Sequence, residues 1–112
     1  MTLQEYQEHV AKTFCGESYD RLIASLAEEL GEVAQVVKEI RVEGFEPEQE
    51  LKLTLELGDL IRYAVMLAVR TQIPLETILY ENMAKIEKRH PKFFRTNVHQ
   101  TGQEITSIIT NK

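Results

Sequence analysis

The sequence contains few of the residues that break helices or cross-link a chain. Its 112 residues include five glycines, three prolines, one cysteine and no tryptophan. The single cysteine, Cys15, excludes an internal disulfide, fits a reducing cytoplasm and is interpreted as a structural residue. No apolar run approaches the roughly 20 residues of a membrane span. The polar N-terminal stretch MTLQEYQEHVAK lacks the features of a signal peptide. We therefore expect a cytoplasmic protein without a membrane segment.

Positive charge is also in short supply. Thirteen Lys and Arg residues stand against eighteen Asp and Glu residues, which gives a net charge of −5. This balance disfavours nonspecific binding to nucleic acid or to an anionic membrane. It does not exclude a nucleotide, because an acidic site binds phosphates through metal ions.

The long apolar periodic runs with little turn chemistry predict helices. A capping box at Thr2 and Glu5, an N-cap at Ser18, a stop at Gly44 and a first-turn Pro47 mark the ends. The predicted helices cover residues 3–14, 19–41, 47–72 and 74–89. We therefore predict an all-α fold with a four-helix bundle-like protomer. It forms a single domain over residues 1–112, in which residues 95–112 are a C-terminal arm.

The third predicted helix is apolar on almost every side. One apolar stripe consists of Leu53, Leu57, Leu60, Ala64 and Leu67. A second, nearly opposite stripe consists of Leu51, Leu55, Val65 and Val69. The segment LKLTLEL alternates as a strand would, but helical spacing continues unbroken to residue 69. A helix with two apolar faces packs on both sides. The second face is expected to meet another subunit, in a homodimer or homotetramer.

Acidic residues interrupt the apolar stripes of the second and third helices. At 100° per residue, Glu29 falls inside one stripe and Glu32 at its edge, while Glu56 and Asp59 lie one turn apart on the next helix. Helices joined by a short loop usually pack antiparallel, which brings the two acidic pairs level. The alternative is that the acids are solvated or paired with Lys and Arg, as is common on helix surfaces.

Converging carboxylates repel one another and raise their own pKa values unless a cation compensates them. Oxygen ligands without Cys or His favour Mg²⁺, or Mn²⁺ as a substitute, over Zn²⁺. The Glu-x-x-His pairs of di-iron bundles do not occur in the chain. The pattern predicts a magnesium site formed by Glu29, Glu32, Glu56 and Asp59.

The fourth predicted helix carries polar groups along one edge of its apolar face, namely Asn82, Lys85 and Arg89. Cations beside a metal site suit a polyphosphate, which needs metal on one side and Lys or Arg on the other. The alternative is a solvated basic last turn that complements the helix dipole. That alternative leaves Asn82 unexplained.

The motifs EELGE, ELGD and NMAKIEKRHPKFF together resemble the MazG-type all-α nucleotide pyrophosphohydrolases over about residues 20 to 95. The resemblance implies a helical bundle that pairs into dimers or tetramers. It also implies Mg²⁺-dependent hydrolysis of a nucleoside triphosphate to the monophosphate and pyrophosphate. Glu29, Glu32, Glu56 and Asp59 match the metal ligands of the family.

The same resemblance assigns roles to the remaining polar residues. Glu28 matches the acid that holds or deprotonates the attacking water, and Glu32 shares the catalytic role. Asn82, Lys85 and Arg89 match the region that contacts phosphates. Two alternatives remain open: a phosphoribosyl-ATP pyrophosphohydrolase of the same superfamily, and a non-catalytic helical interaction module.

Overall fold

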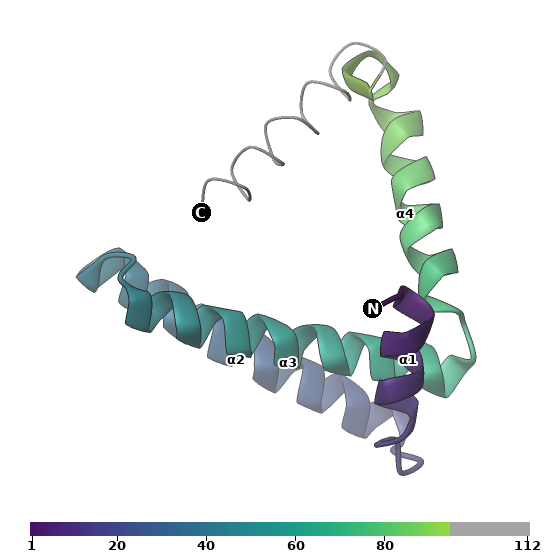
Figure 1. Ribbon diagram of the computed structural model, residues 1–112, viewed down its shortest axis with the longest axis horizontal. Coiled ribbons are helices and arrows are strands. Elements are labelled where there is room, and N and C mark those ends of the chain that lie inside the picture. Colours follow the sequence, from purple (N-terminus) through teal and green to yellow (C-terminus); the bar gives the residue numbers. More distant parts are fainter. Residues whose placement is uncertain (95–112) are drawn as a thin grey trace. The chain divides into compact units, whose positions relative to one another are not determined.

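The computed structural model describes residues 1–94, and the predicted C-terminal arm lies outside these residues. Residues 1–94 form four helices: α1 (Leu3–Ala11), α2 (Tyr19–Glu43), α3 (Pro47–Thr71) and α4 (Leu75–Arg89) (Figure 1). The described residues contain no strand, so the prediction of an all-α fold is confirmed. None of these helices combines the length and the apolarity that a membrane crossing requires, within residues 1–94.

Local chemistry explains where α1 begins and ends. The Thr2 hydroxyl accepts a hydrogen bond from the Glu5 amide, and the Glu5 carboxylate accepts one from the Thr2 amide, both at 3.1 Å. The helix ends at Ala11 rather than at the predicted residue 14, because the chain tightens so that the amide of Thr13 donates to the carbonyl of Val10. Phe14 nevertheless packs against the core, which accounts for its helical spacing.

The hairpin of α2 and α3 is the main element of the chain. Figure 1 shows the two helices side by side and antiparallel. Ser18 caps α2 through the amide of Arg21, and Gly44 ends it at φ 93°. Pro47 opens α3, and the buried Gln49 ties the turn together by bonding to the amide of Glu46 and the carboxylate of Glu43. These turns confirm the predicted hairpin.

The apolar core lies where α1 packs on α3, at one end of the hairpin. Its buried side chains come from three helices: Val10, Leu22, Val65 and Met66. Away from this core, large apolar side chains of the hairpin are exposed, including Leu51 at 61% and Leu55 at 59%. Of the stripe that we predicted to meet another subunit, Leu51 and Leu55 are exposed in the single chain, whereas Val65 lies in the core and Val69 packs against it. Contact of these exposed residues with another subunit stays a prediction.

The chain divides into two compact units, residues 1–76 and 77–112, and each is described by itself. The first holds α1, α2, α3 and the first two residues of α4. The second holds the rest of α4. In this unit the rings of Phe93 and Phe94 pack edge to face, with their centroids 5.4 Å apart. A single domain over residues 1–112 stays a prediction.

Candidate metal centre

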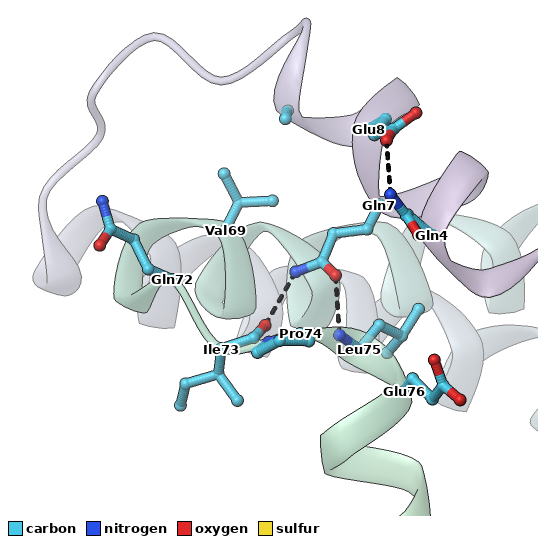
Figure 2. A pocket seen from close by; sticks show the side chains of 10 residues that line it. Gln4, Gln7, Glu8, Val69, Gln72, Ile73, Pro74, Leu75 and Glu76 are labelled. Carbon is cyan, nitrogen blue, oxygen red and sulfur yellow. Dashed lines mark hydrogen bonds between the residues drawn. The ribbon is translucent and has the colours of Figure 1, made fainter.

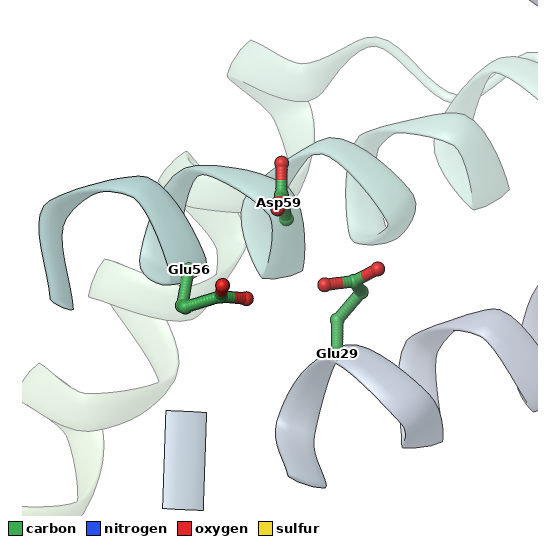
Figure 3. Close-up of side chains that lie close together, drawn as sticks. All are labelled: Glu29, Glu56 and Asp59. Carbon is green, nitrogen blue, oxygen red and sulfur yellow. The ribbon is translucent and has the colours of Figure 1, made fainter. Parts of the chain in front are cut away.

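Three carboxylates from two helices converge near the middle of the hairpin. Glu29 of α2 and Glu56 and Asp59 of α3 each offer an oxygen, and these three oxygens lie within 4.8 Å of one another. Figure 3 shows the carboxylates of Glu29 and Glu56 directed toward one another across the space between the helices. Glu29 and Glu56 are half-buried, whereas Asp59 is exposed. The group is thus open to a ligand on one side.

The convergence arises from the helical repeat. Glu56 and Asp59 are three residues apart, so successive turns of α3 present them on adjoining parts of its surface. The antiparallel partner α2 then presents Glu29 to both. The apolar stripe that carries Glu29 keeps this side chain against α3 instead of leaving it in solvent.

The electrostatic environment of Glu29 is unfavourable for a carboxylate. Burial raises the pKa of Glu29 above its ordinary value of 4.5, and the charges of Asp59 and Glu56 raise it further. The more distant charges of Glu28 and Glu32 act in the same direction on this pKa. A group of this kind favours either a bound proton or a bound cation.

The neighbouring cations of the hairpin are engaged elsewhere. Lys52, one turn before Glu56, pairs with Glu39 at 3.2 Å and with Glu48 at 3.4 Å. Arg62, one turn beyond Asp59, donates to Thr13 and contacts the ring of His9 instead. No ion pair within residues 1–94 involves the three clustered carboxylates. Their negative charge is therefore not compensated by the described part of the chain.

Glu28 and Glu32 lie on the exposed side of α2. The group of mutually close carboxylates does not include them, although the charge of each reaches Glu29. Glu32 is one turn along from Glu29, so it borders the group. The predicted ligand role of Glu32 and the predicted catalytic roles of Glu28 and Glu32 stay predictions.

The predicted phosphate-contacting residues belong to α4. Asn82, Lys85 and Arg89 are all exposed, and their spacing aligns them along one side of the helix. From Thr77 onward α4 belongs to the second compact unit, whereas the clustered carboxylates belong to the first. Their role stays a prediction.

The contact of Arg62 with α1 was not visible in the sequence. His9 and Thr13 lie in a helix and a turn far from α3 in the chain, and no motif links them to Arg62. Only the packing of α1 against α3 brings these groups together. The consequence for the site is that the cation nearest to Asp59 along α3 is held by α1.

The fold and the geometry define a class of all-α proteins in which two antiparallel helices present clustered carboxylates. The family model described as MazG nucleotide pyrophosphohydrolase domain matches residues 17–94. This match covers more than half of the chain, so the protein belongs to the MazG nucleotide pyrophosphohydrolase domain family. Comparison with curated proteins and with solved structures gives no significant match.

Proposed function

We propose that the protein is a Mg²⁺-dependent pyrophosphohydrolase that converts a nucleoside or deoxynucleoside triphosphate to the monophosphate and pyrophosphate. The observation that carries the proposal is the group of Glu29, Glu56 and Asp59 in a member of this family, for which residues 1–94 show no ion-pair partner. Carboxylates are the ligands that Mg²⁺ prefers, and Mn²⁺ accepts the same set.

The residues fit a divalent ion on chemical grounds. Glu29, Glu56 and Asp59 would supply three oxygens, and Glu32 is the fourth proposed ligand. A bound ion would lower the pKa of a coordinated water and neutralise charge on phosphoryl oxygens. The raised pKa of Glu29 supports this assignment, because a cation relieves the repulsion that raises it.

The chain's own groups then carry out the hydrolysis. Glu28, exposed beside the clustered carboxylates, accepts the proton of the attacking water. Glu32, one turn further along α2, shares this catalytic role. The water oxygen forms a bond to the α-phosphorus while the bond to the bridging oxygen of the β-phosphate breaks. Asn82, Lys85 and Arg89 hold the phosphates. The positively charged side chains of Lys85 and Arg89 stabilise the charge on the departing pyrophosphate.

A homodimer or homotetramer is part of the proposal. The exposed side chains of Leu51 and Leu55 of α3 and of Leu30 and Val37 of α2 support it, since association of subunits would remove their apolar area from water. A cytoplasmic location is also proposed, and the exposed free thiol of Cys15 is compatible with a reducing compartment.

The test is pyrophosphate release across a panel of canonical and modified NTPs and dNTPs, with Mg²⁺ and with EDTA. We expect release only with metal, and a loss of about a hundredfold or more in Asp59→Asn and Glu32→Gln without unfolding. Glu48→Gln, an exposed acid on α3 outside the group, is the matched control and retains activity. Turnover in EDTA, or full activity of Asp59→Asn, would overturn the mechanism. Phosphoribosyl-ATP added to the panel tests that alternative substrate directly.

A further inference from the structure

Two side chains near the end of α1 hold the guanidinium of Arg62. Its Nη2 group donates a hydrogen bond to the hydroxyl of Thr13, and its Nη1 group donates to Nε2 of the His9 ring at 3.3 Å. Both acceptors are uncharged, because a protonated imidazole has no nitrogen left that accepts a hydrogen bond. The positive charge of Arg62 is therefore held in place without being neutralised, and no ion pair within residues 1–94 involves it.

α1 is itself fixed on α3 at two places. Val10, which lies between the two acceptors in the chain, is fully buried in the apolar core. The side-chain amide of Gln7 donates to the carbonyl of Ile73 at 2.8 Å and accepts from the amide of Leu75 at 2.7 Å, as the dashed lines in Figure 2 show. The acceptors of Arg62 therefore keep a fixed position beside α3.

Asp59 is the acid of α3 that lies within reach of Arg62. The two residues are three apart, so their side chains leave successive turns of the helix on adjoining parts of its surface. The other positions one turn from Arg62 hold Gly58, Val65 and Met66. Asp and Arg at this spacing attract one another, yet the ion pairs within residues 1–94 do not join them. The bonds to α1 explain why this pair does not form.

An ion pair with Arg62 would occupy the carboxylate of Asp59. Asp59 is the exposed member of the clustered carboxylates. A guanidinium engages both oxygens of a carboxylate through parallel N–H donors, and a divalent ion binds the same oxygens. The two cations would therefore compete for one side chain, and the bonds to α1 remove one of the competitors.

Lys52, the cation that precedes the clustered carboxylates on α3, is held in a different way. Its partners are the carboxylates of Glu39 and Glu48, so acids compensate its charge. Arg62 has neutral partners and keeps its full attraction for Asp59. Its retention on α1 therefore depends on two hydrogen bonds rather than on an opposite charge.

We propose that Thr13 and His9 are positioning residues of the metal centre, which hold Arg62 on α1 and thereby keep Asp59 available to a divalent ion. The inference rests on the proposed function in one respect, because Asp59 is a metal ligand only there. Release of Arg62 lets the ion pair form, and the affinity for the divalent ion falls by the strength of that pair. For an exposed pair this amounts to about twofold to fivefold.

The first experiment measures Mn²⁺ affinity by titration calorimetry. The double variant Thr13→Val, His9→Phe removes both acceptors and keeps the size of both side chains. We expect it to bind Mn²⁺ about twofold to fivefold more weakly than the wild type. Thr13→Ser, which retains the hydroxyl, is the matched control and keeps the wild-type affinity. An unchanged affinity in the double variant would overturn the inference.

A third substitution separates the release of Arg62 from damage to the packing of α1. Arg62→Met, added to the double variant, removes the guanidinium, and we expect the Mn²⁺ affinity to return at least to the wild-type value. Weak binding that persists without the guanidinium would show that packing is the cause, and the inference would be wrong. If the double variant does not fold, Thr13→Val takes its place, and a wild-type affinity for it contradicts the proposal.

A crystal structure of the metal-free double variant locates the released side chain. We expect the guanidinium of Arg62 within about 4 Å of the carboxylate of Asp59, and any other position would contradict the proposal. A wild type that binds Mn²⁺ but releases no pyrophosphate would overturn the proposed reaction and not this inference. A wild type that binds no Mn²⁺ would overturn both the metal site and the inference.

Discussion

Glu29 is the carboxylate of the candidate site whose charge is least favourable, because it is partly buried and lies beside other carboxylates. It lies in an apolar stripe of α2, and the carboxylates of Glu56 and Asp59 face it from α3. Arg62 and Lys52, the cations that flank this region of α3, bond to other partners. The stability of the metal-free protein should therefore depend on whether Glu29 is protonated.

This dependence predicts an effect of pH with a definite sign. Because the pKa of Glu29 is raised above 4.5 in the folded state, the folded protein binds the proton more tightly than the unfolded chain. The stabilisation that protonated Glu29 gives the folded state is complete below pH 4.5, and it is lost as the pH rises through the raised pKa of Glu29. We expect metal-free Glu29→Gln to melt a few degrees above the wild type at pH 7. The two should converge well below pH 4.5, as measured by calorimetry in EDTA.

Added magnesium should reverse the order of the two proteins. At a concentration about 100 times its Kd, an ion that binds only the folded state stabilises it by about 2.7 kcal/mol. We expect this gain in the wild type and not in Glu29→Gln. An equal response of both proteins to magnesium would contradict the role of Glu29 as a ligand.

Part of the candidate site follows from the sequence at this scale. The 100° step of a helix places Glu29 and Glu56 in apolar stripes, and the structure finds them with Asp59 in one group. The sequence did not separate Glu32 from that group, because a position at the edge of a stripe is compatible with either side. The hydrogen bonds of Arg62 to Thr13 and of Gln7 to Ile73 depend on where α1 packs, and no periodicity of α3 reveals that position.

At the scale of elements, the two long helices owe their geometry to the turn between them. Gly44 has φ 93° and ψ 172°, a conformation that side chains with a Cβ rarely adopt. Gly31, by contrast, lies inside α2, and a Cβ there would meet nothing within 4 Å. The backbone conformation after α2 therefore requires a glycine at position 44, whereas the backbone within α2 does not require one at position 31.

Alanine substitutions at these glycines should have opposite effects. Gly44→Ala should lower the free energy of unfolding by about 1–3 kcal/mol through backbone strain. Gly31→Ala should raise it by about 0.5–1 kcal/mol, because alanine loses less conformational freedom in a helix. Urea denaturation measures both values. A loss of stability in Gly31→Ala would indicate that a partner approaches α2 closely at this residue.

Helix existence was predictable, and helix ends were predictable where a cap was visible. Ser18, Gly44 and Pro47 mark boundaries that the structure reproduces within two residues, since α2 ends at Glu43 rather than at residue 41. α1 ends at Ala11, three residues before the predicted end, because the amide of Thr13 donates to the carbonyl of Val10 and forms a tighter turn. Apolar spacing alone does not distinguish a helical turn from a tight turn that buries Phe14 equally well.

At the scale of the whole molecule, the hairpin contributes both to the core and to a set of exposed apolar side chains. Leu22, at 1% exposure, belongs to the core beside α1, while Leu51 and Leu55 of α3 are exposed. The sequence predicted two apolar faces on α3 but not which residues α1 would cover. The partner of the remaining exposed side chains depends on contacts outside a single hairpin.

We expect the chain to self-associate through the exposed face of the hairpin. Leu55→Asp should shift the mass in sedimentation velocity toward the monomer and lower the melting temperature at micromolar concentration, since association stabilises the folded subunits. Leu22→Ala is the contrasting variant. It should cost about 2–5 kcal/mol of stability by opening a cavity, with the assembly otherwise retained. A monomeric wild type would contradict the oligomer.

The clustered carboxylates lie between helices that are also held together by the turn at Gly44, the ion pair of Lys52 with Glu39 and the packing near α1. An ion shared by Glu29, Glu56 and Asp59 would therefore act as a reversible cross-link near the middle of the hairpin. The segment between this cross-link and the turn would become more resistant to proteases when the ion is present. Cleavage near residues 44–46 would then report on the supply of metal to the protein.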